Sequence, residues 1–142
     1  MANYYCTSRS NYFEVKNPQA FYHWAKNRGL KCWHKEDDEE GRVLYAVAPA
    51  ELDDRSTDDG SWPGFDWATG KEFDLFEELS QHLADDWVAV FMQAGAEKMR
   101  YVSGFATAID SKGERIDIAL HDIYQRAEEE FGAQANITPA EY

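Results

Sequence analysis

In the first third of the sequence, the spacing of hydrophobic residues changes from a strand pattern to a helix pattern and back again. The cluster of β-forming residues at 11–15 predicts a first strand. Asn17 followed by Pro18 predicts a helix start, because the Asn side chain can cap a free N–H and Pro fits the first helical position. We expect this helix to end at Gly29. Residues 30–48 alternate between apolar and polar side chains, which predicts a β-hairpin with a charged turn.

The middle of the sequence holds a second helix pattern, which follows a long segment without periodicity. Residues 50–70 show no hydrophobic period, and loops of this length inside a compact domain are usually functional or mobile. Thr69–Glu72 carries the signature of a capping box. Leu75, Leu79 and Leu83 follow at four-residue spacing. Together these features predict an amphipathic helix that begins near Thr69 and continues past Leu83.

The last third of the sequence predicts three strands and a final helix. Residues 87–92, 99–109 and 115–119 are rich in β-forming side chains and are separated by turn residues, which is typical of an antiparallel meander. The final helix has one apolar stripe, made of Ile123, Ala127 and Phe131, and Gly132 ends it.

The resulting order, β-α-β-β-α-β-β-β-α, predicts a single α+β domain with an antiparallel or mixed sheet and about three helices. The first six elements match a split β-α-β order, so a ferredoxin-like topology is the leading expectation. We expect the domain to span residues 1–132 and residues 133–142 to form a loosely held tail.

The composition fits a folded protein despite its acidity. Aromatic residues make up 15% of the 142 residues and hydrophobic residues 44%, which excludes a disordered acidic chain. No apolar run approaches the length of a membrane span, and residues 1–12 lack the apolar core of a signal peptide, so we expect a cytoplasmic protein. Cys6 and Cys32 are too few for a disulfide framework and fit reduced, buried residues.

The net charge of −13 is concentrated in one part of the chain. Residues 36–86 hold 17 of the 27 acidic residues and only three basic ones, whereas residues 1–35 carry a net charge of +5. Such a concentration of like charge lowers stability unless solvent or a basic partner relieves it. Direct binding of nucleic acid is disfavoured, because this negative field repels phosphates.

No pattern in the sequence specifies catalysis or a metal site. Cys6, Cys32 and His34 lack the close C-x2-C pair of structural zinc sites, and an EF-hand alignment of residues 53–60 places Arg55 at the first ligand position. A general acid needs an apolar pocket, but these carboxylates lie in a polar run that keeps them ionised. We therefore expect no catalytic residue, no metal and no cofactor.

The second predicted helix carries an acidic stripe. The stripe consists of Asp74, Glu78, His82 and Asp86, at four-residue spacing. Two further acids, Glu77 and Asp85, lie beside it. Successive stripe positions are about 6 Å apart, which is close to the spacing of phosphates along a nucleic-acid strand. Because like charges at this spacing repel, the stripe indicates either a basic partner or a solvated helix face.

Two further groups complete the predicted binding surface. A second acidic patch consists of Glu36, Asp37, Asp38, Glu39 and Glu40. The long loop adds three aromatic residues that could anchor a partner, Trp62, Phe65 and Trp67. Carboxylates would steer and orient a basic partner, whereas aromatics would supply buried contact area.

In its size, its charge and the pattern of residues 36–86, the chain resembles the small acidic counter-defence proteins of phages and plasmids, the nucleic-acid mimics among anti-restriction and anti-CRISPR proteins. Residues 10–16 and 97–102 are also similar to small mobile-element proteins of unassigned role. The resemblance implies an inhibitor that acts without turnover on a basic nucleic-acid-binding protein or complex.

Two alternatives remain open. The first is an immunity or interaction module that neutralises a basic toxin or nuclease. The second is a small enzyme or ligand-binding domain whose cleft lies under residues 50–70. The sequence indicates no particular oligomeric state.

Overall fold

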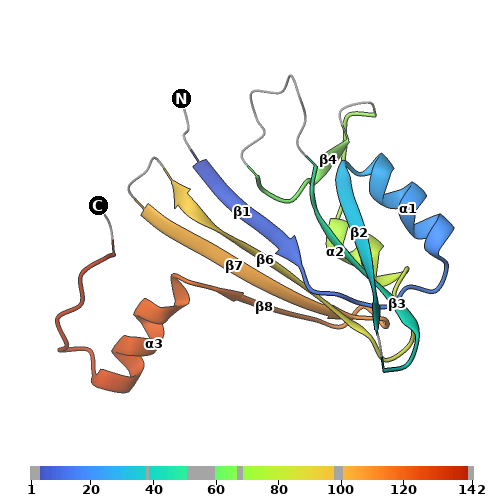
Figure 1. Ribbon diagram of the computed structural model, residues 1–142. Helices are drawn as coiled ribbons and strands as arrows, with labels where there is room; N and C mark the ends of the chain where they lie inside the picture. The colour runs from blue at the N-terminus through green and yellow to red at the C-terminus, as the bar shows by residue number, and fades with distance from the viewer. Residues whose placement is uncertain (1–3, 38, 51–59, 67–68, 98–100, 141–142) are drawn as a thin grey trace.

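The computed structural model describes residues 4–37, 39–50, 60–66, 69–97 and 101–140. Its elements, in chain order, are β1 (Tyr4–Ser10), α1 (Pro18–Asn27), β2 (Leu30–Asp37), β3 (Arg42–Pro49), β4 (Phe65–Asp66), β5 (Lys71–Glu72), α2 (Leu75–Ser80), β6 (Val88–Glu97), β7 (Tyr101–Asp110), β8 (Arg115–Ala119) and α3 (Asp122–Phe131). This is the predicted α+β fold and order of elements, with the short β4–β5 hairpin added (Figure 1).

The strands form one large sheet and two hairpins. The large sheet is antiparallel, with the order β1-β6-β7-β8. β2 and β3 form the predicted hairpin, in which Leu30 pairs with Pro49 and Asp37 with Arg42. β4 pairs with β5 in the segment that the sequence left without periodicity.

Residues 13–15 join the large sheet to the β2–β3 hairpin. The backbones of Phe13 and Tyr45 exchange two hydrogen bonds of 2.9 and 2.7 Å. On its other side, Val15 forms an antiparallel bridge with Leu83. At the end of β1, the Ser10 hydroxyl accepts a hydrogen bond of 2.9 Å from the backbone N–H of Val47. The strands thus follow one another in space as β8, β7, β6, β1, β3 and β2.

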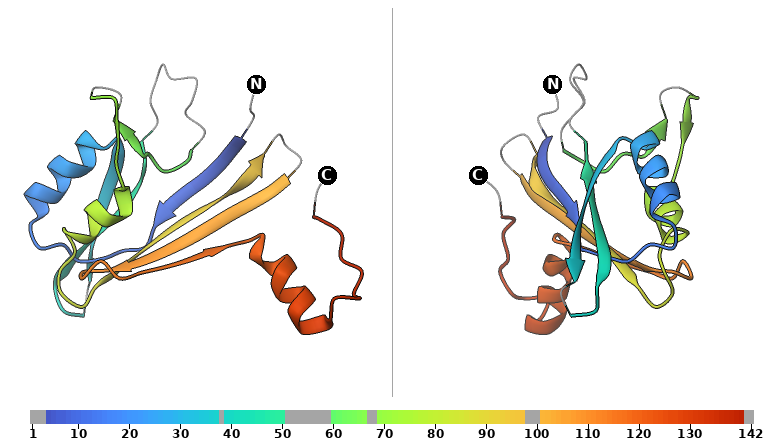
Figure 2. Two further views of the ribbon diagram at one scale, coloured as in Figure 1. Left: turned by 180° about the vertical axis from the view of Figure 1, so that it is seen from behind. Right: turned by 45° about the vertical axis from the view of Figure 1, so that its right-hand side comes forward.

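The part of this series from β6 to β2 has the strand order of the expected split β-α-β unit. α1 and α2 lie together on one side of the strands, where Trp24 of α1 donates a hydrogen bond of 2.9 Å to Glu78 of α2 (Figure 2). Contact between β1 and β3 is limited to their adjoining ends, so the ferredoxin-like arrangement is present in an opened form.

The core lies between the two helices and the strands. Phe21 of α1 is at its centre, with its ring centroid 5.8 Å from that of Phe13 and 5.6 Å from that of Tyr45. Phe91 of β6 stacks at 4.3 Å on Phe76 of α2, which attaches the large sheet to the same core. These rings are buried, and this burial is the main favourable term in folding.

The first strand lies earlier in the chain than predicted, in residues 4–10 rather than 11–15. The side chain of Asn11 accepts a hydrogen bond of 2.7 Å from the N–H of Val90 and donates one of 3.0 Å to the carbonyl of Val88. Because a side chain occupies these backbone groups, the ladder between β1 and β6 ends there. Phe13 and Val15 then form single bridges to other segments.

The prediction of a long second helix was wrong. α2 begins at Leu75, because the carboxylate of Asp74 accepts hydrogen bonds of 3.2 Å from the N–H groups of Phe76 and Glu77. Thr69 lies in the turn between β4 and β5 and caps no helix. After Ser80 the chain leaves the helix, which allows Leu83 to pair with Val15.

The last helix was predicted with the right stripe and the right end, but it packs differently from α1 and α2. Gly132, with φ of 96°, ends α3, and none of the ten residues of α3 is buried. Ile123 is 62% exposed and Phe131 is 78% exposed. α3 lies beyond the end of β8 and away from α1 and α2 (Figures 1 and 2).

One face of the large sheet is apolar and largely exposed in the part of the chain that the structure describes. Ala89, Phe91 and Ile109 point into the core, so the alternate positions point to the opposite side, which we term the outer face. The outer face consists of Val88, Val90, Met92 and Ala94 of β6, Val102, Gly104, Ala106 and Ala108 of β7, and Ile116 and Ile118 of β8. Ile116 is 71% exposed, so no described segment covers it.

The loop that precedes β4 is fixed against β1 at a glycine. Gly60 has φ of 86°, and a Cβ there would overlap the carbonyl oxygen of Cys6. Gly70 has φ of 72°, and a Cβ there meets nothing within 4 Å. We expect Gly70→Ala to cost about 1 kcal/mol of unfolding free energy through backbone strain alone.

Gly60→Ala adds a clash with backbone to the same strain and is expected to cost about 3 kcal/mol. Urea unfolding of both variants measures the difference. Equal costs for the two substitutions would contradict the packing of Gly60 against β1.

Candidate partner-binding surface

Three turns that are distant in sequence meet at one end of the molecule. The guanidinium of Arg42, at the tip of the β2–β3 hairpin, lies 5.6 Å from the ring centre of Trp87 in the turn before β6. Val88, the next residue, pairs with Asp110 at the start of the β7–β8 turn. Figures 1 and 2 show the hairpin tip, the beginning of β6 and the β7–β8 turn at the same end.

These turns place eight described acidic residues together. We term this surface the acidic end, which consists of Glu36, Asp37, Glu39, Glu40, Asp85, Asp86, Asp110 and Glu114. All but Asp37 and Asp110 are exposed. Arg42 forms an ion pair with Glu40, and Lys112 is the other basic residue of these turns. The acidic end thus combines parts of both predicted patches, and Asp38 lies outside the described residues.

The acidic end has a defined shape because two of its carboxylates hold the turns. Asp110 accepts hydrogen bonds of 2.9 Å from the N–H groups of Lys112 and Glu114. Asp37 accepts one of 3.1 Å from the N–H of Glu39. Asp86 has φ of 69°, a left-handed conformation in which Asp is tolerated better than most residues. Hydrogen bonds from carboxylates thus hold the backbone in two of the three turns.

Among the described residues, five of these acids have side chains that form neither an ion pair nor a hydrogen bond, and they are Glu36, Glu39, Asp85, Asp86 and Glu114. Asp85 and Asp86 belong to the predicted set, but they lie in a turn rather than on a helix. The predicted four-residue stripe therefore does not exist as a helix face. Asp110 and Glu114 were missed, because only the pairing of β6 with β7 brings them to this surface.

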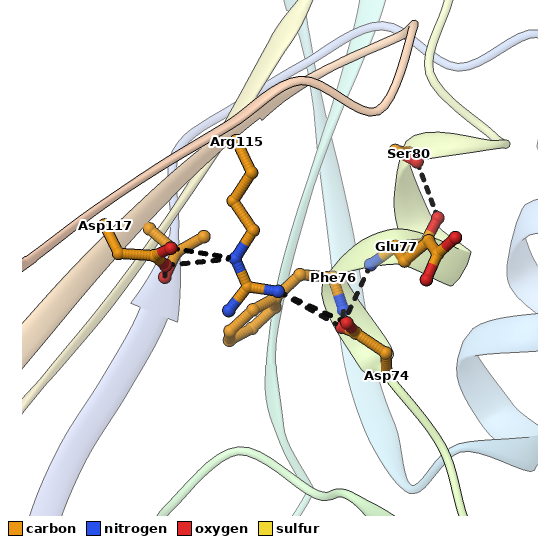
Figure 3. A network of polar contacts seen from close by, with 7 residues as sticks. Asp74, Phe76, Glu77, Ser80, Arg115 and Asp117 are labelled. Carbon is orange, nitrogen blue, oxygen red and sulfur yellow. Dashed lines mark hydrogen bonds and ion pairs between the residues drawn. The ribbon is translucent and has the colours of Figure 1, made fainter.

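Asp74, the first member of the predicted stripe, has a structural role. Besides capping α2, its carboxylate lies 3.2 Å from a guanidinium nitrogen of Arg115 (Figure 3). Arg115 also binds Asp117, and its guanidinium lies 5.2 Å from the ring centre of Phe76. The pKa of Asp117 is lowered, mainly by a hydrogen bond of 2.6 Å from the Thr107 hydroxyl. The hydrogen bond and positive charge of Arg115 lower it further. This network connects β8 to the start of α2.

Glu78 is also used within the fold. Arg28 binds both of its oxygens at 2.8 and 3.0 Å, and the indole N–H of Trp24 donates a further hydrogen bond. Burial raises the pKa of Glu78, but the hydrogen bonds from Arg28 and Trp24 outweigh it, and the net pKa is lowered. His82, beside them, has its pKa lowered by burial next to the Trp24 ring.

Glu77 remains exposed on the first turn of α2. Its backbone carbonyl accepts a hydrogen bond of 2.6 Å from the Ser80 hydroxyl (Figure 3). The acids of the predicted helix patch thus have three different roles. Asp74 and Glu78 cap or pair within the fold, Glu77 is exposed, and Asp85 and Asp86 belong to the acidic end.

Of the three predicted aromatic anchors, Trp62 is the one whose side chain the structure describes. The ring of Trp62 lies 5.0 Å from that of Phe91, and its indole N–H donates to the carbonyl of Met92 at 3.3 Å. Trp62 therefore packs mainly against the core. Phe65 pairs with Glu72 through its backbone, and Trp67 lies outside the described residues.

A groove lies beside Trp62, where the sequence predicted a cleft under residues 50–70. It has a volume of about 680 Å³. Residues 61–63 line one side, the start of α2 another, and Gln93, Phe105 and Arg115 its floor. Because Arg115 is already paired with two carboxylates, the groove presents aromatic and acidic groups rather than a free cation.

No known protein family, curated protein or solved structure matches this chain. The resemblance to acidic counter-defence proteins therefore stays a prediction from the sequence. None of the helices in the described residues is long and apolar enough to cross a membrane.

The lowered pKa of Glu78 gives a pH-dependent prediction. A lowered folded-state pKa means that Glu78 contributes its full stabilisation above the unfolded-state pKa and loses it as the pH falls through the folded-state value. We expect Glu78→Gln to cost about 1–2 kcal/mol of unfolding free energy at pH 7, because Arg28 and Trp24 lose their charged acceptor.

This cost should shrink as the pH is lowered from 7 to 3, as measured by urea unfolding. Glu77→Gln, at the neighbouring exposed position, is the matched control and should change the unfolding free energy by less than about 0.5 kcal/mol. A cost for Glu78→Gln that is constant over this pH range would rule out the proposed role of its charge.

Proposed function

We propose that this protein is a non-catalytic acidic binding protein that blocks a basic nucleic-acid-binding surface of a defence protein or complex. The observation that carries the proposal is the acidic end, where three separate turns present exposed carboxylates and two of the turns are held by hydrogen bonds. This arrangement offers a basic groove a set of negative charges in the place of phosphates.

The physical advantage of the acidic end is its preorganisation. Its turns close strand pairs of the fold, and Arg42 and Trp87 hold the hairpin tip against the turn that carries Asp85 and Asp86. A partner that binds there does not have to order these segments first, so little conformational entropy is lost. The repulsion among the carboxylates would be relieved when basic side chains approach.

The paired acids of the fold are excluded from this surface. Asp74 and Glu78 already bind Arg115 and Arg28, so they cannot engage a partner without breaking structural contacts. Binding should therefore depend on acids such as Glu39, Asp85 and Glu114, and not on Asp74 or Glu78.

The test is a charge reversal on the acidic end. Tagged protein is incubated with lysate of its own host cell at about 50 mM and about 300 mM salt, between which screening of exposed charges becomes strong. We expect wild type to retain one stoichiometric nucleic-acid-binding protein at low salt and less of it at high salt. The triple variant Glu39→Lys, Asp85→Lys, Glu114→Lys should lose that protein.

The matched control is a second triple variant, Glu72→Lys, Glu77→Lys, Glu129→Lys, which changes the net charge by the same amount at other positions. These three residues are exposed and lie outside the acidic end. The control should retain the partner. Equal retention by the two triple variants, or equal loss, would contradict a role specific to the acidic end.

Added duplex DNA or RNA separates the proposal from the immunity alternative. A partner held at its nucleic-acid-binding surface should be displaced by nucleic acid, because both compete for the same basic groups. A toxin or nuclease that is neutralised elsewhere on its surface would stay bound.

The groove beside Trp62 favours a second candidate function, the binding of a small ligand. Its volume of about 680 Å³ lies within the usual range for ligand pockets, and Glu72 and Asp74 among its lining residues favour a neutral or cationic ligand. If this function holds, native mass spectrometry of the freshly purified protein should show a bound small molecule. Phe105→Arg, which fills the groove floor, should abolish the adduct, and a spectrum of unliganded wild type would count against this function.

A further inference from the structure

α3 is an amphipathic helix whose apolar stripe has no packing partner among the described residues. It has only ten residues, fewer than the ~12–15 that an isolated helix needs to be even marginally stable in water. Helices of this length depend on burying their apolar face, yet Ile123 is 62% and Phe131 is 78% exposed. Residues 133–139 cover a different side of α3, around Tyr124 and Glu128. The apolar stripe is thus free to contact a surface that does not belong to the described residues of the same chain.

The outer face of the large sheet has the complementary property. β7 contributes only small residues at its centre, Gly104, Ala106 and Ala108, and these lie between larger side chains of β6 and β8. A helix could therefore approach the sheet closely along β7. An exposed apolar surface of this extent on a folded protein marks an interaction site.

The area of these two surfaces fits a stable dimer. Eight large apolar side chains are exposed on the outer face, on α3 and at Leu120, which lies between β8 and α3. Their exposed surface totals on the order of 900 Å², close to the roughly 800 Å² that each partner buries in a standard interface.

The charges beside the two surfaces are also complementary. On the rim of the outer face, the guanidinium of Arg9 lies 5.2 Å from the Trp33 ring, and the ammonium of Lys35 lies 4.2 Å from the Tyr12 ring. On α3, residues 128–130 are three consecutive glutamates, and at helical spacing Glu128 and Glu130 flank the apolar stripe. An α3 that lies on the outer face would bring acidic side chains toward this basic rim.

The turn before α3 directs the helix away from its own sheet. The N–H of Ala119 donates a hydrogen bond of 3.0 Å to Asp122, and the N–H of Leu120 donates one of 2.9 Å to the carbonyl of Gly104. Leu120 itself packs over Gly104. These contacts fix the point at which the chain leaves β8, and α3 continues beyond it (Figure 1).

We propose that two copies of this chain form a symmetric dimer in which α3 of each copy packs its apolar stripe on the outer face of the other. The exchange is reciprocal, so both copies bury the same two surfaces, as a closed two-fold interface requires. Each dimer carries two acidic ends, and each adjoins the outer face where Val88 pairs with Asp110.

The first test is the molar mass in solution, measured by light scattering after gel filtration at about 50 µM protein, since association depends on concentration. Wild type should have twice the mass of the 16.3 kDa chain. Phe131→Asp on the stripe and Ile118→Asp on the outer face should each reduce the mass to that of one chain. Gln125→Asp, which adds the same side chain on the opposite side of α3, is the matched control and should remain dimeric.

A second measurement identifies the contact as one between copies. In chains in which Cys6→Ser and Cys32→Ala remove the native thiols, Ile123→Cys is placed in one population and Met92→Cys in another. Mixing the two under mild oxidation should give a covalent dimer between them, and replacing Ile123→Cys with Gln125→Cys should abolish it.

Three outcomes would overturn the proposal. They are a wild-type mass of one chain, a dimer that persists in both Asp variants, and a disulfide that forms within a single chain carrying both Ile123→Cys and Met92→Cys but not between the two populations. The last would show that α3 folds back on its own sheet. Should the cysteine chains fail to fold, the mass measurements on the Asp variants still decide the question.

Discussion

The fold depends on the backbone pairing of Phe13 with Tyr45. This pair is where the β2–β3 hairpin joins the large sheet, and the next bridge, from Val15 to Leu83, closes the other side of the same segment. Between these contacts the Phe13 ring enters the core against Phe21. Residues 13–15 thus supply both the backbone bridges and a ring of the core. The hairpin, α1 and the large sheet therefore cannot separate without exposing the centre of the core.

The parts of the fold that local signals control were predicted well. Asn17 caps α1 as expected, and Gly29, with φ of 73°, follows its end, because capping involves only neighbouring residues. α2 was misplaced because two capping signals compete, one at Thr69 and one at Asp74 followed by Glu77. Leu83 also fits the helical spacing, although it is buried through its bridge to Val15, a contact that no local pattern can indicate.

The candidate surface was only partly predictable for the same reason. The excess of acidic residues in 36–86 is visible in the sequence, but the sequence does not show which of them are neutralised by basic residues elsewhere in the chain. Arg28 and Arg115, from outside this segment, take Glu78 and Asp74 into structural ion pairs. The acids that remain exposed are brought together by the ends of strands, so strand topology, and not helical spacing, decides their arrangement.

The pairing of β1 with β6 sets an order in which the chain can fold during synthesis. Tyr4 pairs with Glu97, so β1 has no partner until most of the chain has left the ribosome. An unpaired strand edge is prone to aggregate until its partner strand is made. The acid-rich residues 36–86 are made in this interval, and like charges on neighbouring nascent chains repel one another. The same concentration of charge that weakens the compact state therefore protects the chain while that state is still out of reach.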